Sequence, residues 1–376
     1  GGGSFIGTLG LTFNNFSLRN FLKFKDFKPV PQGDGHTLSI QAQAGQYFQN
    51  YGISFTEPWL FGTRPTALSV SVNQSLVRYS DQFGETQKLN IFSASAGLNR
   101  LLRWPDDYFS LYTGIQYQSY DFSNYPFQFG NETEYNGSAK NFSFNVGLSR
   151  MSAGLDPIFP TQGSNLEASV KFTPPYSLFS DKNYATMTNV EKYKWLEFYK
   201  VKMKADVYNT VVGKLVLRST AEMGFLNGYN KELGAPPFER FYVGGTGLFG
   251  GRYDGRELLP LRGYENASST GGTLEDVTPY GGATVYNRFA LELRYPISMN
   301  QTAKIYALSF LEGGNAWNSF GTYNPFQLKR SAGVGVRVYM GAFGLIGFDF
   351  AYGFDKTLMG TEPAGWKTHF LMNQSL

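Results

Sequence analysis

Cysteine is absent from the sequence, and histidine occurs only twice, at His36 and His369. Without thiols the chain has no disulfide bonds, no thiolate nucleophile and no cysteine-ligated metal site. The two histidines are the only candidates for a general base, and no Gly-x-Ser-x-Gly turn is present to display a hydrolase serine. We therefore expect no enzymatic activity and no bound metal or cofactor.

Charged residues are also scarce. They make up 16% of the chain, compared with about 25% in an average soluble protein. No run of about 18 apolar residues is present, which excludes a helical membrane span. The net charge of +4 is small, and the basic residues do not cluster among aromatic ones, so we expect no nucleic-acid partner.

Aromatic residues and glycine are abundant instead, with 34 Phe, 25 Tyr and 44 Gly. Apolar and polar residues alternate with a period of two along the whole chain, which is typical of β-strands. The polar face of these strands is too polar to form a protein core. Lipid outside and water inside explain both faces, and closure into a barrel leaves no unpaired backbone edge in hydrocarbon. In one segment Tyr199, Val201, Met203, Ala205 and Val207 alternate with Lys200, Lys202, Lys204 and Asp206.

The pattern predicts an all-β fold, a transmembrane antiparallel β-barrel that occupies residues 1–376 as a single domain. Bacterial single-chain barrels have an even number of strands, so we expect a barrel of about 16 strands, of which this chain supplies about 15. The predicted strands are 5–13, 36–45, 49–57, 64–75, 87–100, 107–120, 139–150, 164–173, 195–209, 213–225, 286–295, 304–312, 329–339, 344–354 and 364–374.

Tyrosines near the ends of these strands indicate where the barrel meets the two membrane surfaces. Tyrosine is enriched at membrane–water interfaces because its ring is apolar and its hydroxyl is polar. The tyrosines that we expect in the two interfacial girdles include Tyr47, Tyr51, Tyr108, Tyr117, Tyr120 and Tyr352.

One connection, from about residue 226 to residue 285, is far longer than the others. Loops of this length are functional or disordered in most proteins. It contains Leu261-Arg262-Gly263-Tyr264, which resembles the Val-Arg-Gly-Phe/Tyr signature of the BamA superfamily of outer-membrane barrels. The preceding residues 239–245 are similar to the approach to that signature. Further segments resemble the family in the same order along nearly the whole chain: 55–62 its early hairpin, 156–163 its mid-barrel turn, 310–317 the segment after the signature, and 347–353 its penultimate strand.

The resemblance implies that the long loop folds into the barrel lumen, where acidic groups of the inner wall hold Arg262. Independently of the resemblance, a guanidinium inside a barrel needs carboxylates, because it is permanently charged and its forked donors match a carboxylate. The candidate partners are Glu292, Glu312 and Asp349. Strand alternation turns Glu292 and Asp349 inward. Glu312 shares its parity with Tyr306, Leu308 and Phe310, so we expect a bulge or a strand-end position to bring it inside.

The two ends of the chain carry further expectations from the resemblance. Residues 5–16 are similar to the family's second strand, so its first strand and the periplasmic POTRA domains would lie upstream of Gly1; the alternative is a Gly-rich scar before a true first strand. The family usually ends on an aromatic residue but this chain ends on Leu376, which makes Phe370 the expected aromatic anchor. The residues that share one face of the last strand are Trp366, Thr368, Phe370, Met372 and Leu376.

The resemblance implies a function without bond chemistry. We expect an insertase in the outer membrane of a Gram-negative bacterium, which folds other β-barrel proteins at the seam where its first and last strands meet. Its expected partners are nascent outer-membrane proteins, accessory BAM-type lipoproteins, periplasmic chaperones, the lipid bilayer and lipopolysaccharide. The alternatives are a two-partner secretion pore, a TamA-like translocation barrel and a diffusion porin.

Overall fold

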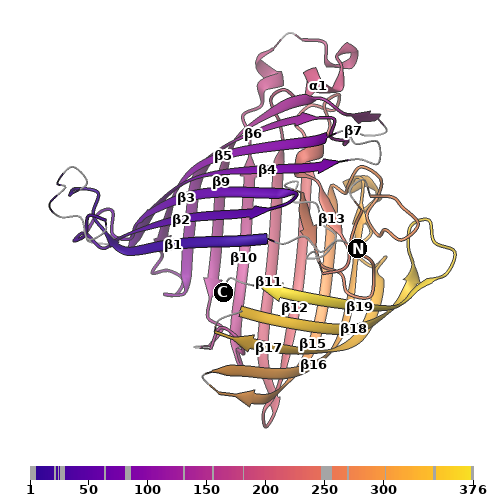
Figure 1. Ribbon diagram of the computed structural model, residues 1–376. Coiled ribbons are helices and arrows are strands. Elements are labelled where there is room, and N and C mark those ends of the chain that lie inside the picture. Colours follow the sequence, from indigo (N-terminus) through magenta and orange to yellow (C-terminus); the bar gives the residue numbers. More distant parts are fainter. Residues whose placement is uncertain are drawn as a thin grey trace.

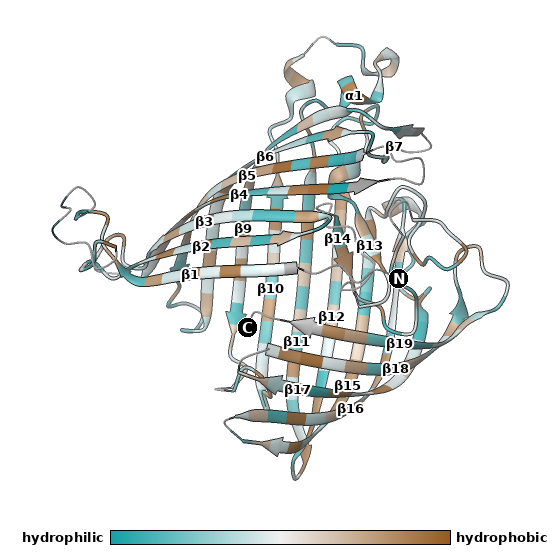
Figure 2. Ribbon diagram, viewed as in Figure 1, coloured by the Kyte–Doolittle hydropathy of each residue, from teal (hydrophilic) through white to brown (hydrophobic). Residues whose placement is uncertain are grey.

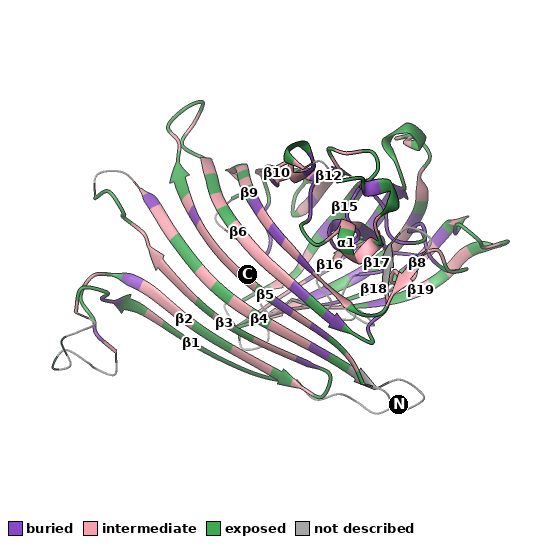
Figure 3. Ribbon diagram, turned by 90° about the horizontal axis from the view of Figure 1, so that it is seen from above, coloured by how far each residue is buried: buried purple, intermediate pink, exposed green. Residues whose placement is uncertain are grey.

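A computed structural model describes most of the chain. The described residues are 6–20, 23, 25, 30–62, 65–80, 86–129, 132–154, 156–180, 182–246, 256–268, 271–300, 302–341 and 344–373. Within them, a single 15-stranded antiparallel sheet dominates, and Figures 1 and 3 show it curling into the wall of a β-barrel.

Each strand of this sheet pairs with the next one along the chain, so the order is a simple meander. All fifteen predicted strands are confirmed, with shifts at their ends. The strands are β1 (Ile6–Phe16), β2 (His36–Gly45), β3 (Phe48–Glu57), β4 (Thr66–Ser80), β5 (Thr86–Leu101), β6 (Phe109–Ser123), β9 (Gly137–Met151), β10 (Gly163–Phe172), β11 (Tyr199–Val212), β12 (Leu215–Asn227), β15 (Val285–Met299), β16 (Ala303–Trp317), β17 (Lys329–Met340), β18 (Gly344–Lys356) and β19 (Pro363–Asn373).

The sheet ends at β1 on one side and β19 on the other, and no ladder joins these two strands in the part of the chain that is described. Smaller elements lie between the long strands. No helix among the described residues is long and apolar enough to cross a membrane. The smaller elements are β7 (Phe127–Phe129), β8 (Glu132–Glu134), η2 (Tyr176–Phe179), η3 (Tyr184–Thr186), α1 (Asn189–Lys192), η4 (Pro237–Glu239), β13 (Phe241–Val243), β14 (Glu257–Leu259) and η5 (Phe320–Thr322).

Hydrophobic and hydrophilic residues alternate along the strands, as Figure 2 shows by the change between brown and teal. On β15, Leu291 and Leu293 are 48% and 40% exposed on the outer face, whereas Glu292 and Arg294 are buried on the inner face. A lipid-facing apolar surface and a polar interior are the arrangement that a transmembrane barrel requires.

The tyrosines predicted to form girdles divide into two groups. Tyr47, Tyr51 and Tyr108 are exposed, and Tyr117 and Tyr352 are partly exposed. Tyr120 is buried instead, and its ring centroid lies 4.7 Å from that of Phe238. The prediction for Tyr120 was wrong because its strand parity points into the barrel, where residues of the long loop cover it.

Residues 228–284, between β12 and β15, form the long connection that we call the signature loop. Its described part includes the parallel pair of β13 and β14. Phe238 and Phe241 of this loop belong to the same buried cluster as Tyr120 and Tyr286, whose side chains come from the wall. The signature loop therefore packs against the inside of the sheet.

The two faces can be distinguished by placing the same charge on neighbouring residues of β6. Ile115 is 44% exposed on the outer face, and Gln116 lines a cavity inside. We predict that Ile115→Arg lowers the free energy of unfolding in lipid vesicles by about 2–4 kcal/mol. Gln116→Arg should change it much less, because its charge remains in an aqueous interior. Equal losses in urea titrations of both variants would contradict the assignment of the faces.

Candidate functional site

The Leu261-Arg262-Gly263-Tyr264 motif is buried against the last strands of the sheet. Leu261 and Tyr264 are fully buried, and the hydroxyl of Tyr264 donates to the carbonyl of Arg330 at 2.8 Å. Gly263 has a φ of +87°, and a Cβ atom there would lie 2.7 Å from Cβ of Ser331. Only glycine combines this backbone conformation with so close an approach to β17.

The Arg262 side chain lies among three carboxylates of the inner wall, one each from β16, β15 and β18. Its Nε donates to Glu312 Oε2 at 2.8 Å. Its Nη2 lies 2.8 Å from Glu292 Oε1, an ion-pair contact without the direction of a hydrogen bond. Its Nη1 lies 3.5 Å from Asp349 Oδ2. The structure therefore brings together Arg262 and all three acidic residues that the sequence singled out.

Glu312 reaches this position without any bulge in β16, whose pairing with β17 is regular around it. The expectation of a bulge was wrong because Tyr306, Leu308 and Phe310 do not face lipid. All three are buried on the inner face together with Glu312. The guanidinium carbon of Arg262 lies 3.7 Å from the centroid of the Phe310 ring, so a cation–π contact also stabilises the charge.

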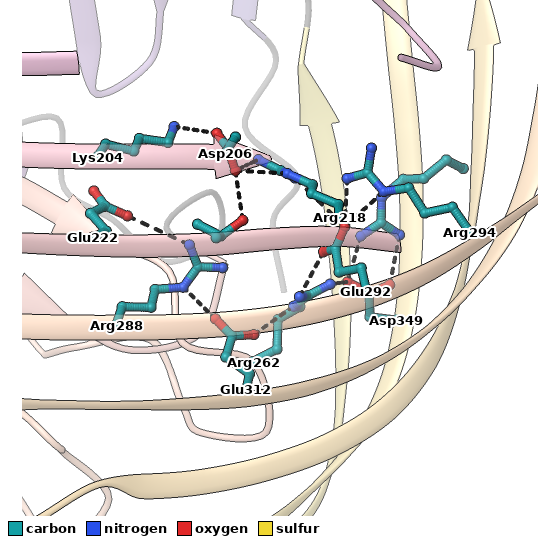
Figure 4. A network of polar contacts seen from close by, with 12 residues as sticks. Lys204, Asp206, Arg218, Glu222, Arg262, Arg288, Glu292, Arg294, Glu312 and Asp349 are labelled. Carbon is teal, nitrogen blue, oxygen red and sulfur yellow. Dashed lines mark hydrogen bonds and ion pairs between the residues drawn. The ribbon is translucent and has the colours of Figure 1, made fainter. Parts of the chain in front are cut away.

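Further arginines of the wall surround the three carboxylates, as Figure 4 shows. Arg337 donates to both oxygens of Asp349, at 2.6 and 2.8 Å. Arg294 binds Glu292, with its Nε donating at 2.9 Å. We call the whole set the arginine cluster; its members are Arg218, Arg262, Arg288, Arg294 and Arg337 with Asp206, Glu222, Glu292, Glu312 and Asp349.

Two opposing effects set the pKa of the Arg262 guanidinium, which belongs to the loop rather than to a membrane-spanning strand. Burial by itself lowers that pKa. The negative charges of Glu312, Glu292 and Asp349 outweigh it and raise the pKa above its ordinary value. Arg262 is therefore a fixed positive charge, and the three surrounding carboxylates offset it.

A second set of ion pairs holds the signature loop on a different part of the wall. Glu239 of the loop lies 2.5 Å from Lys171 Nζ on β10 and 3.2 Å from Lys200 Nζ on β11. Glu257 lies 2.6 Å from Lys200 and 2.8 Å from Lys202. We call these three lysines the lysine wall. The loop thus presents carboxylates to a basic wall and an arginine to an acidic one.

Burial also opposes ionisation at this second contact. Burial by itself raises the pKa values of Glu239 and Glu257, but the neighbouring lysines outweigh it and hold both pKa values below the ordinary range. Both carboxylates therefore stay charged. A cavity of about 410 Å³ borders this contact, lined by the lysine wall and by polar side chains of β5, β6, β9 and β10.

The last strand, β19, also contacts the signature loop. His369 Nε2 accepts a hydrogen bond from the backbone N–H of Gly263 at 2.9 Å. Trp366, Thr368 and Phe370 lie on the opposite, exposed face of the strand, as their shared parity predicted. Met372 is the penultimate residue of β19, and Leu376 lies outside the described residues.

Sequence reasoning did not identify the loop carboxylates Glu239 and Glu257 or the wall arginines as site residues. The inward parity of Lys200 and Lys202 was visible in the alternation along β11. Their partners lie in irregular loop structure, where no periodicity indicates the direction of a side chain. Only the tertiary fold joins them.

The described geometry agrees with what comparisons with known proteins find. The family model of the Omp85 superfamily domain matches residues 32–368. The chain belongs to the Omp85 superfamily. It is therefore a barrel of the outer-membrane type.

Solved structures of other barrels resemble this Omp85 barrel. BamA from Haemophilus ducreyi lacking POTRA domains 1–3 matches with a TM-score of 0.64 and 16% identity, over 98% of this chain and 70% of that one. CdiB from Escherichia coli matches with a TM-score of 0.56 and 14% identity, over 97% of this chain and 58% of that one. At these identities the likeness shows a shared fold. No curated protein sequence matches this Omp85 barrel significantly.

The arginine cluster gives a direct test of stability. Arg262→Ala would leave buried carboxylates without their central cation, and we expect it to lower the free energy of unfolding by about 3–5 kcal/mol. Charge reversal at Glu292, Glu312 or Asp349 should have a similar effect. The pair of Arg330 and Asp355 offers a control; the Arg330 side chain is 67% exposed, so Arg330→Ala should cost much less than Arg262→Ala. Wild-type urea unfolding curves for all of the cluster variants would rule out a clamp on Arg262.

The lysine wall can be tested with a double-mutant cycle. We expect Glu239→Gln and Lys200→Met to be coupled by about 0.5–3 kcal/mol, because each removes the partner of the same buried pair. The free energies of unfolding of both single variants and the double variant measure this coupling. Glu239→Gln combined with Arg330→Ala should be additive, because Arg330 pairs with Asp355 instead. Full additivity in the first cycle would contradict the claim that the lysine wall holds the signature loop.

Proposed function

We propose that this Omp85 barrel folds and inserts other β-barrel proteins into the outer membrane of a Gram-negative bacterium. The exchange takes place at the seam between the first and last strands of the barrel. The observation that carries the proposal is that the signature loop lies inside the barrel and is held there by buried ion pairs. A substrate strand at the seam meets an edge of the sheet without displacing these contacts.

The edge of β19 supports this mechanism physically. Backbone groups at the edge of a sheet are costly in hydrocarbon when they lack partners, and an incoming strand satisfies them by β-augmentation. The strand needs no cofactor and no covalent step for this exchange. Local thinning of the bilayer beside short apolar faces would lower the barrier for the substrate. The protein would act by providing a template, not as an enzyme.

The same proposal defines the partners. They are nascent outer-membrane proteins, periplasmic chaperones that deliver them, accessory lipoproteins, and the bilayer with its lipopolysaccharide. The protein would have one transmembrane domain over residues 1–376, with the lumen-inserted loop at about 226–285.

Two-partner secretion is the second candidate, because the structure of CdiB from Escherichia coli also shares the fold. Secretion through the lumen would require the signature loop to leave both the arginine cluster and the lysine wall. A TamA-like translocation barrel is a related alternative. A diffusion porin is disfavoured because the loop packs against the inside of the wall.

Insertion can be measured with the full chain in lipid vesicles. We predict that vesicles containing it fold a urea-denatured outer-membrane β-barrel protein faster than empty vesicles do, as followed by the heat-resistant gel shift of the folded substrate. The same vesicles should show only a small single-channel conductance. A large steady conductance with no faster folding would instead support a pore.

A further inference from the structure

Contacts with the described part of the signature loop hold the last strand from the lumen side. Lys367 Nζ lies 2.6 Å from Glu265 Oε1, the N–H of Gly263 donates to His369 Nε2 at 2.9 Å, and the hydroxyl of Thr246 donates to the carbonyl of Phe370 at 3.3 Å. β19 is an end strand of the sheet, paired along one side with β18. These contacts therefore act on a strand that has a single neighbour in the described sheet.

The three contacts differ in quality. The Lys367–Glu265 pair is partly exposed, with 22% and 43% of its side chains accessible, and a surface pair of this kind contributes little. The Thr246 hydrogen bond is long. His369 is 6% exposed, and its Nε2 accepts a hydrogen bond from the backbone N–H of Gly263 in the buried motif. A buried donor that loses its partner is expensive, so the imidazole is the strongest of the three.

We propose that His369 is a positioning residue that fastens the seam strand to the signature loop, and that breaking its hydrogen bond to Gly263 releases β19 for strand exchange. The inference rests on the proposed function at the seam. His369 acts through its hold on the loop rather than by touching substrate. The motif that carries Arg262 thereby secures both the inner wall and the strand at the edge of the sheet.

The hydrogen bond fixes the state of the imidazole. A nitrogen that accepts from an N–H carries no proton, so His369 is neutral with its proton on Nδ1. Protonation of Nε2 would place two donors face to face and break the contact. Acidification therefore loosens the hold. The charged groups around His369 are Asp349 of β18, Arg262 and Glu265 of the loop, Glu312 of β16, and Lys367 of β19, with Arg337 of β17 bound to Asp349.

Hydrogen–deuterium exchange of the full chain in lipid nanodiscs tests the proposal. His369→Leu removes the acceptor, whereas His369→Gln keeps one in its side-chain carbonyl. We expect the backbone amides of residues 366–371 and 261–264 to exchange roughly 5- to 150-fold faster in His369→Leu, the range that the loss of one buried partner allows. His369→Gln should remain close to wild type. Thr368→Val, on the outer face of the same strand, is the matched control and should leave exchange unchanged.

A pH series gives a second readout that does not depend on the folding of His369→Leu. After correction for intrinsic exchange, wild-type β19 should lose protection as the imidazole becomes protonated at acidic pH, and His369→Gln should not. Wild-type protection that stays constant through this range would overturn the proposal. Equal acceleration in peptides from β4 and β5 of His369→Leu would also overturn it, because that pattern reports loosening of the whole barrel.

The vesicle folding assay on the same samples separates this inference from the proposed function. Faster exchange at β19 in His369→Leu, without any acceleration of substrate folding by the wild-type protein, would support the role of His369 and contradict the insertase function. Accelerated substrate folding by the wild type, together with unchanged exchange in His369→Leu, would support the insertase function and contradict the role of His369.

Discussion

The permanent charge of Arg262 is the constraint on which the interior of this barrel depends. A guanidinium taken out of water must be surrounded by carboxylates, and those carboxylates need further cations in turn. Glu312, Glu292 and Asp349 meet the first requirement, and wall arginines such as Arg294 and Arg337 meet the second. Such a network adds less stability than its many contacts suggest. Its larger effect is to favour one position of the loop, since any shift would leave buried charges without partners.

Much of this arrangement could be predicted from the sequence because a membrane barrel obeys a simple rule. Alternation with a period of two located all fifteen strands of the sheet, and the same parity turned Glu292 and Asp349 inward. The rule failed at Glu312 and Tyr120, where loop residues pack on the inner face and make it apolar. Polarity then no longer distinguishes the inside from the outside. The partners of the lysine wall were not predictable, because Glu239 and Glu257 lie outside the long strands.

The loop also explains why two walls of opposite charge can exist in one lumen. The lysines on β10 and β11 would repel one another without the carboxylates of Glu239 and Glu257. On the other side, wall arginines already pair with the acids of β15, β16 and β18, and Arg262 adds the cation that all three acids share. A loop that carries both charges in the right order satisfies both walls, and a slip of a few residues along the chain would satisfy neither.

The order of these contacts along the chain has a consequence for how the protein itself is made. The partners of Glu239 and Glu257 lie on β10 and β11, which precede the loop in the sequence, whereas the partners of Arg262 lie on β15, β16 and β18, which follow it. The Arg262 site is complete only when β15, β16 and β18 lie together in the sheet, and the hydrogen bond of Gly263 requires β19 beside them. The signature loop is therefore fully docked only after strands on both sides of it in the sequence have paired.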